Sequence, residues 1–264
     1  MKTKFFNLFL ILIFTGCKVK YVEVFKTDST NTIKRDNHYV FENDSIKIDY
    51  FFWAENGIMR FSIYNKSNFP IYIDWKKSSY ISNTNKLDYW VDETESTTLS
   101  FNSGYLYKGP FLYPNVIVSN NLGTATTKSK KSERITFIPP KTKISNSLYK
   151  IAITPFYGWA TDYEKTIVAR NGNPKKKTTI FTKKFSEENS PILFRNFLTF
   201  STKEDFSKEF YVDNVFYVKE IAEMDKRNFG KDSVYYGTNY EVLTTTVPFN
   251  IIGTDFYVTL PTKR

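Results

Sequence analysis

One short region near the start of the chain restricts it to β structure more than any other feature. Apolar side chains occupy every second position from Ile46 to Phe52 and again from Met59 to Ile63. This period places alternate side chains on opposite faces of a β-strand. Glu55-Asn56-Gly57 is a turn sequence between the two runs, and Pro70 opens a third run that ends at Trp75. The pattern predicts a three-stranded antiparallel meander.

Shorter runs with strand composition follow. They lie at residues 87–91, 115–118, 134–138, 148–153, 192–200, 210–218, 242–247 and 256–260. Residues 218–228 have Ile221 and Met224 at helical spacing, which predicts one short helix. Many short strands with little helix are typical of a β-sandwich. We therefore expect an all-β fold, an immunoglobulin-like antiparallel β-sandwich with long loops and at most one or two short helices.

Polar stretches without periodicity separate these runs. Residues 119–132, 169–177 and 230–240 are expected to form long loops. Residues 17–37 predict a flexible tether that leads into the first strand. The folded part is then one domain, residues 38–264, and two small β domains joined near residues 119–132 are the alternative.

The first sixteen residues have the composition of an export signal. Two lysines precede an apolar run from residue 5 to residue 14, which is shorter than the roughly 20 residues that span a bilayer as a helix. The small residues Thr15 and Gly16 then stand directly before Cys17, the single cysteine of the chain. We expect residues 1–16 to be a signal peptide that is removed.

A signal sequence ending in small residues before a cysteine resembles the lipobox of bacterial lipoproteins, with Phe14 where leucine is usual. The stretches Tyr64–Trp75 and Arg134–Lys141 look like patterns of Bacteroidetes lipoproteins and imply no activity. The resemblance implies that the Cys17 sulfur receives a diacylglyceryl group and that the new amino terminus is acylated. Two or three acyl chains give stable anchoring. An ordinary signal peptide with an incidental cysteine, or a short apolar strand, is the alternative.

The resemblance also implies a place in the cell. The chain is expected in the cell envelope, lipid-anchored at the outer membrane and exposed either to the periplasm or at the surface. In some Bacteroidetes lipoproteins an acidic cluster after the cysteine directs surface export, and no such cluster follows Cys17. The choice between the two compartments therefore stays open.

The charge of the chain comes mainly from lysine. The formal net charge is +10, and small lysine clusters lie at residues 128–131, 175–177 and 183–184. Sites for nucleic acids favour arginine, which makes bidentate contacts with bases, and lysine is far commoner than arginine here. We therefore expect no nucleic-acid partner, and weak attraction to anionic headgroups or glycans is the alternative.

Few residues have the pattern of a catalytic or metal site. His38 is the single histidine, so neither a histidine-based triad nor a zinc site beside a lipidated cysteine is expected. Carboxylates cluster at Asp88, Asp92, Glu93 and Glu95. A solvated loop is the expected interpretation, with a hydrolytic pair or a loose calcium site as alternatives. We expect no catalytic residue, no metal and no cofactor.

Aromatic residues are the candidates for binding. Tyr89 and Trp90 lie beside the acidic cluster, and Tyr157 and Trp159 follow a strand that stops at Pro155. Flat rings next to Asp and Asn suit both a sugar ring and a protein interface. Aromatic residues make up 18% of the chain, so these rings are also expected to fill the core of a large sandwich.

These features together predict a lipid-anchored envelope protein that is not an enzyme. Its expected partners are membrane lipid, through Cys17, and an envelope protein or glycan that the sandwich binds or scaffolds. A glycan-binding module that uses exposed aromatics and a carboxylate-based hydrolase are the alternatives. Stacked aromatics on an exposed face would favour the first, and two carboxyls about 5–10 Å apart in a cleft would favour the second.

Overall fold

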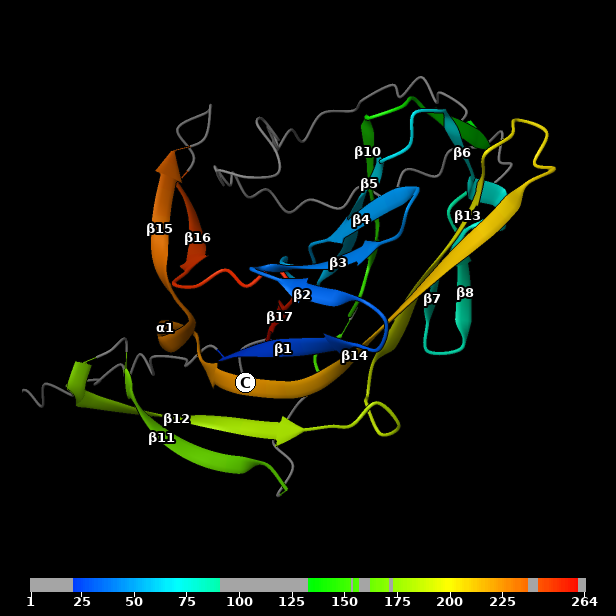
Figure 1. Ribbon diagram of the computed structural model, residues 1–264. Helices are drawn as coiled ribbons and strands as arrows, with labels where there is room; N and C mark the ends of the chain where they lie inside the picture. The colour runs from blue at the N-terminus through cyan, green and yellow to red at the C-terminus, as the bar shows by residue number, and fades with distance from the viewer. Residues whose placement is uncertain are drawn as a thin grey trace, which may run out of the picture.

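Almost all the regular structure of the chain is antiparallel β-sheet. The computed structural model describes residues 21–90, 133–152, 154–156, 162–170, 173–236 and 242–260. Within them the strands form two large sheets and one two-stranded ribbon (Figure 1). The predicted all-β, sandwich-like fold is confirmed.

The largest sheet has ten strands. Its main path is β11-β12-β14-β13-β6-β9, with β1 and β17 paired beside β14 and with β7 and β8 paired beside β13. The strands are β1 (Tyr21–Ser29), β6 (Ile71–Asp74), β7 (Ser79–Ser82), β8 (Asn85–Asp88), β9 (Ile135–Ile138), β11 (Glu164–Arg170), β12 (Asn173–Lys184), β13 (Leu193–Ser201), β14 (Glu209–Asp225) and β17 (Phe256–Thr259).

The second sheet has five strands in the order β10-β5-β4-β3-β2. They are β2 (Ile33–Arg35), β3 (His38–Glu42), β4 (Ile46–Tyr50), β5 (Ile58–Asn65) and β10 (Lys143–Lys150), and the ribbon is β15 (Gly230–Tyr236) with β16 (Val242–Pro248). Two short helices complete the elements, η1 (Trp75–Lys77) and α1 (Lys226–Phe229). In the part of the chain that the structure describes, no helix is long and apolar enough to cross a membrane.

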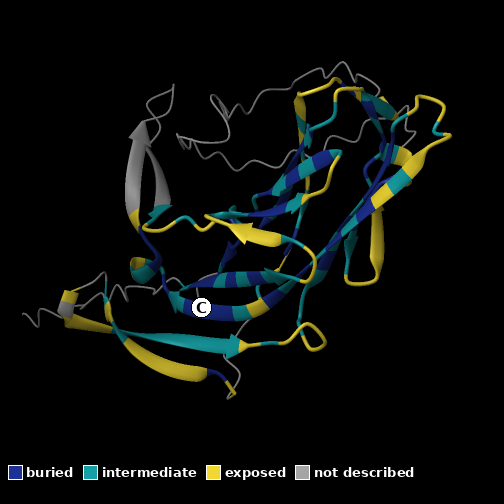
Figure 2. Ribbon diagram, viewed as in Figure 1, coloured by how far each residue is buried: buried dark blue, intermediate teal, exposed yellow. Residues whose placement is uncertain are grey.

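The core lies between the two large sheets. The core cluster draws its residues from both sheets, and Figure 2 shows buried stretches on β4, β5, β13 and β14. Aromatic rings join the sheets directly. Phe52 meets Phe194 edge-on at 5.2 Å between ring centroids, and Tyr50 meets Phe216 at 4.9 Å. The alternation from Ile46 to Phe52 thus fixes the inner face of the smaller sheet, as the sequence predicts.

A buried chain of polar side chains crosses this aromatic core. The Tyr50 hydroxyl donates to Asn214 Oδ1 at 2.7 Å and accepts from Asn196 Nδ2 at 3.1 Å. The Tyr89 hydroxyl donates to Asn196 Oδ1 at 2.7 Å. Asn196 and Asn214 face each other across β13 and β14, and both are fully buried. Tyr50, from the opposite sheet, thus serves Asn214 Oδ1 and Asn196 Nδ2, and Tyr89, which follows β8 of the same sheet, serves Asn196 Oδ1. These bonds compensate for lost hydration, whereas Asn214 Nδ2 has no hydrogen-bond partner among the described residues.

The longest strand, β14, corrects the prediction of a helix at residues 218–228. The strand continues to Asp225, and only α1 after it is helical. Ile221 packs in the main core, whereas Met224 packs on the opposite face with Val22 and Phe229. A strand that is buried on both faces has no strict alternation of apolar and polar residues. Its apolar residues can therefore fall three positions apart, which is also the spacing of a helix.

The predicted tether is also corrected. Residues 21–29 form β1, which pairs along its whole length with β14 and at four positions with β17. Phe25 is fully buried and stacks on Phe256 at 4.8 Å. The polar run after Phe25 suggested a linker, but two neighbouring strands supply the backbone partners that local sequence cannot reveal. The fold therefore begins at or before Tyr21, and not at His38.

The third strand of the expected meander and two of the expected loops also differ from the structure. The run after Pro70 does not complete a meander, because β6 pairs with β13 and β9 in the larger sheet. Residues 169–170 and 173–177 belong to the paired strands β11 and β12, and residues 230–236 form β15. Strands on both sides of residues 91–132 share each large sheet, since β9 pairs with β6 and β10 pairs with β5. The immunoglobulin-like strand order stays a prediction.

Candidate binding surface

The candidate residues named from the sequence lie in three different situations. Cys17, Tyr157 and Trp159 lie outside the described residues. Tyr89 is only 8% exposed and donates its hydroxyl to Asn196, so its ring fills the core and offers no exposed face. Trp90 is half-buried, and the Lys76 ammonium lies 5.5 Å from its ring centroid. The structure thus places Trp90 at the surface beside η1 and removes Tyr89 from a shared aromatic patch.

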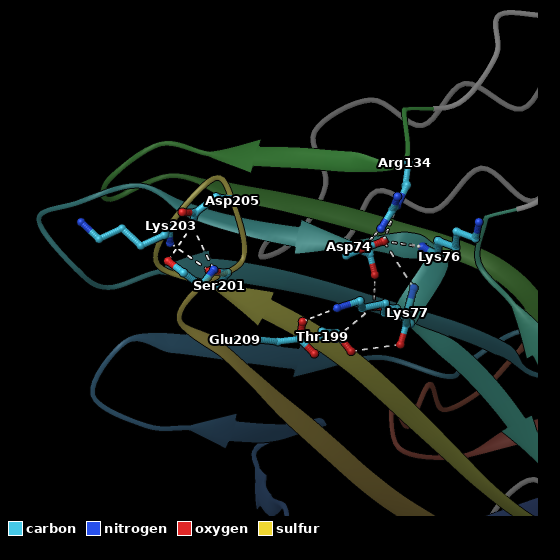
Figure 3. A network of polar contacts seen from close by, with 11 residues as sticks. Asp74, Lys76, Lys77, Arg134, Thr199, Ser201, Lys203, Asp205 and Glu209 are labelled. Atoms are coloured by element: carbon cyan, nitrogen blue, oxygen red, sulfur yellow. Dashed lines mark hydrogen bonds and ion pairs between the residues drawn. The ribbon is translucent and has the colours of Figure 1, made fainter.

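The corner at η1 is built around one buried carboxylate. Asp74 is 1% exposed, and its Oδ1 accepts hydrogen bonds from the backbone NH groups of Lys76 and Lys77 at 3.0 and 3.4 Å. Arg134 adds a bidentate contact, at 3.2 Å to Oδ1 and 2.7 Å to Oδ2 (Figure 3). Asp74 therefore caps the helix and ties β9 to it.

Electrostatics keep this carboxylate ionised. Burial alone would raise the pKa of Asp74, but the hydrogen bonds and charge of Arg134, with the two backbone NH groups, hold that pKa below its ordinary value. All of these contacts are intramolecular. The contacts of Asp74 with Lys76, Lys77 and Arg134 are accordingly structural, and they fix the position of the Lys77 backbone.

Lys77, the last residue of η1, extends its side chain over the outer face of the larger sheet. Its carbonyl oxygen accepts a hydrogen bond from the Thr199 hydroxyl at 3.0 Å, and its ammonium reaches the carboxylate of Glu209 on β14 (Figure 3). The Phe206 ring lies 5.8 Å from the same ammonium. The side chain thus crosses β13 and borders the surface described next.

The outer face of β13 and β14 carries an exposed aromatic pair beside an ion pair. Tyr211 is 69% exposed and stacks on Phe197, with ring centroids 5.4 Å apart. Arg195 holds Asp213 in a bidentate ion pair, and Phe197 stands opposite Asp213 in the strand register. We call these four residues, together with Lys77 and Glu209, the β13–β14 surface. It presents a flat ring, a cation and carboxylates on a rigid sheet.

A second pair of carboxyls lies inside the fold. Glu23 on β1 and Glu223 on β14 are directly opposite each other in register, and they are 0% and 3% exposed. Glu23 Oε2 accepts the backbone NH of Phe156 at 2.7 Å. Burial, followed by the charges of Glu23 and Glu223, raises the pKa of the nearby Tyr163 hydroxyl. The pair sits beneath residues 154–156 and is closed to solvent.

His38 and Asp88, which the sequence analysis considered for catalysis or metal binding, contact neighbouring side chains of the fold. His38 Nε2 lies 3.2 Å from Asp49, which also binds Lys47. Asp88 pairs with Lys86 and accepts from Ser79, while Asp92, Glu93 and Glu95 lie outside the described residues. Over the described ranges, no group of three or more His, Cys, Asp or Glu side chains is arranged to hold a metal ion.

Sequence reasoning missed the β13–β14 surface for an identifiable reason. Residues 192–200 and 210–218 are predicted as strands from their apolar composition, and they lie in β13 and β14, which pair with each other. The odd-numbered positions of that pair include Arg195, Phe197, Tyr211 and Asp213. Their alternation with buried residues was the signal of a second, outward face.

Searches of protein-family models, of curated protein sequences and of solved structures find no match to this chain.

Proposed function

We propose that this chain is a lipid-anchored protein of the bacterial cell envelope whose β-sandwich binds or scaffolds an envelope partner and does not catalyse a reaction. The anchor is Cys17, on the strength of the lipobox-like sequence before it. The observation that carries the binding role is the β13–β14 surface, where a 69% exposed tyrosine stacks on Phe197.

The composition of this surface fits recognition. Exposed aromatic rings and arginine are enriched where proteins bind partners. Aromatic rings bury a large area with few rotatable bonds, and arginine presents a planar set of hydrogen-bond donors. Arg195 and Asp213 orient each other, so their remaining hydrogen-bonding capacity is presented in a fixed geometry. A surface that lies on two central strands is also pre-organised, which lowers the entropic cost of binding.

A glycan is the second candidate partner. A sugar ring stacks on a flat aromatic face and hydrogen-bonds to adjacent carboxylates and guanidinium groups. Tyr211 and the Arg195–Asp213 pair offer both features within neighbouring positions of two paired strands.

Hydrolysis is not part of the proposal. A hydrolase needs substrate between its two carboxyls, and the Glu23–Glu223 pair is closed to solvent. Of the acidic cluster that the sequence offers for hydrolysis, Asp92, Glu93 and Glu95 lie outside the described residues, so a hydrolase there stays the weaker alternative. The position of Glu23 and Glu223 between β1 and β14 supports a role in packing under residues 154–156.

The binding role is tested with a chain that starts at Lys18, which retains every described residue. Glycan arrays and envelope extracts are probed with this chain, with a Tyr211→Ser variant and with an Ile33→Ser control. Ile33 is 63% exposed on β2 of the other sheet. We expect Tyr211→Ser to lower affinity about 30-fold or more, as for an aromatic hot spot, and Ile33→Ser to leave it unchanged. Equal binding by all three chains contradicts the role of this surface.

The anchor is tested separately in cells. Wild-type chain and Cys17→Ser are fractionated and labelled with a fatty acid. We expect label and membrane retention only with Cys17. If neither form takes up label, the lipoprotein assignment is wrong, whatever the outcome at Tyr211.

A further inference from the structure

The β11–β12 hairpin carries a strong local excess of positive charge. Residues 164–184 contain seven basic residues and one acidic residue, a formal charge of +6 within a chain of +10. The basic residues are Lys165, Arg170, Lys175, Lys176, Lys177, Lys183 and Lys184. Such a concentration of one sign on a single hairpin indicates an anionic partner.

The three lysines at the start of β12 are the most available of these. Lys175, Lys176 and Lys177 are all exposed, and their ammonium groups have no ion-pair partner among the residues that the structure describes. By contrast, Arg170 lies 3.8 Å from Asp225, and Lys183 pairs with Asp162. Ile167 on β11 is 69% exposed and adds an apolar side chain to the same hairpin.

Strand register sets the direction in which the hairpin points. Met224 of β14 is opposite both Val22 of β1 and Ile180 of β12. Residues 173–179 therefore extend beyond the paired part of β14, at the end where β1 begins (Figure 1). Seven residues of strand cover about 23 Å at roughly 3.3 Å each.

The proposed anchor, Cys17, precedes the same end of β1 in the sequence. Cys17 is four residues before Tyr21, and four extended residues reach at most about 14 Å. A lipid on Cys17 thus holds the start of β1 near the membrane surface, and the hairpin projects farther than the anchor can reach. The lysines must then meet the headgroup layer or bend away from it.

We propose that the β11–β12 hairpin docks on anionic phospholipid headgroups through Lys175, Lys176 and Lys177, and so orients the sandwich on its membrane. This inference rests on the lipid anchor proposed above. Lysine near an anionic bilayer surface strengthens binding by electrostatic attraction, and an exposed isoleucine adds shallow apolar burial. The β13–β14 surface is free to bind its partner at the same time.

The test uses the chain from Lys18, so that no acyl group contributes. Cosedimentation is measured with vesicles of phosphatidylcholine alone and with vesicles that also contain phosphatidylglycerol. The variant is Lys175→Gln with Lys176→Gln and Lys177→Gln. The matched control is Lys143→Gln with Lys203→Gln and Lys208→Gln, three exposed lysines away from the hairpin. Circular dichroism and urea midpoints verify that all chains fold.

We expect binding to the anionic vesicles only, and weaker binding at high salt. The hairpin variant should bind about a hundredfold less, since each lysine near the surface contributes a factor of about five, and the control should bind as the wild type does. Equal binding to both vesicles overturns the proposal, as does equal loss in the two variants. Retention on DNA without retention on vesicles also overturns it. A hairpin that fails this test while Cys17 is still acylated leaves the anchor intact.

Discussion

Removing one hydroxyl from the core should destabilise the whole sandwich. Tyr50→Phe keeps the ring that packs against Phe216 and Phe61. It removes the donor to Asn214 Oδ1 and the acceptor for Asn196 Nδ2, at 2.7 and 3.1 Å. The change therefore isolates two hydrogen bonds between the sheets from the packing around them.

The magnitude follows from burial. Each amide group that loses its partner in a dry core costs about 1–3 kcal/mol, so two such groups lower the free energy of unfolding by about 3 kcal/mol. For a chain of this size that corresponds to a melting temperature about 6–12 °C lower. Urea denaturation at pH 7 measures the change directly, because it exceeds the error of extrapolation.

The control is Tyr211→Phe, which removes a hydroxyl from a residue that is 69% exposed. We expect a change within about 0.5 kcal/mol there. A Tyr50→Phe/Asn214→Leu double variant should lose less stability than the two single variants added together, by about 1 kcal/mol or more. If Tyr50→Phe is no more destabilising than Tyr211→Phe, the polar chain does not support the core and the reasoning fails.

Three other changes probe other parts of the fold. Phe25→Ala should cost about 3–5 kcal/mol, because the ring is fully buried on Phe256; a flexible tether would tolerate it, and urea midpoints decide. Gly57→Ala should cost about 2–4 kcal/mol, because φ is +63° and a Cβ would stand 2.8 Å from Phe256 Cγ; an unchanged melting temperature would contradict this. Arg134→Gln should lower the free energy of unfolding at pH 7, because Asp74 loses its bidentate partner. The Asp74 pKa is lowered in the folded state, so this stabilisation is full above pH 3.8 and falls as the pH drops through the folded value. Wild type and variant should converge in acid, and a constant difference from pH 7 to pH 2 would refute the assignment.

Local patterns predicted those elements whose two faces differ. The strand β4 alternates strictly between buried and half-buried residues, and β5 keeps its predicted apolar residues Met59, Phe61 and Ile63 buried. The two runs at residues 192–200 and 210–218, predicted as strands, form β13 and most of the first half of β14.

Elements that depend on distant partners were not predictable in this way. Residues 21–29 form a strand because the backbone groups of β14 are available to pair with them. The sequence around residues 21–29 gives no information about that distant strand. The same limit applies to β6, whose partners are β9 and β13 rather than its neighbour in sequence. At the candidate site, Tyr89 and Tyr211 are both tyrosines in strand-like sequence, and only the packed structure separates the buried ring from the exposed one.

The position of β1 has a consequence for the timing of folding. Thr27 donates its hydroxyl to the carbonyl of Thr254, 227 residues later in the chain. The strand β1, the first among the described residues, therefore cannot complete its contacts until nearly all of the polypeptide has been synthesised. Contacts of such separation slow folding. We accordingly expect β1 to be among the last strands to take its place in the sheet.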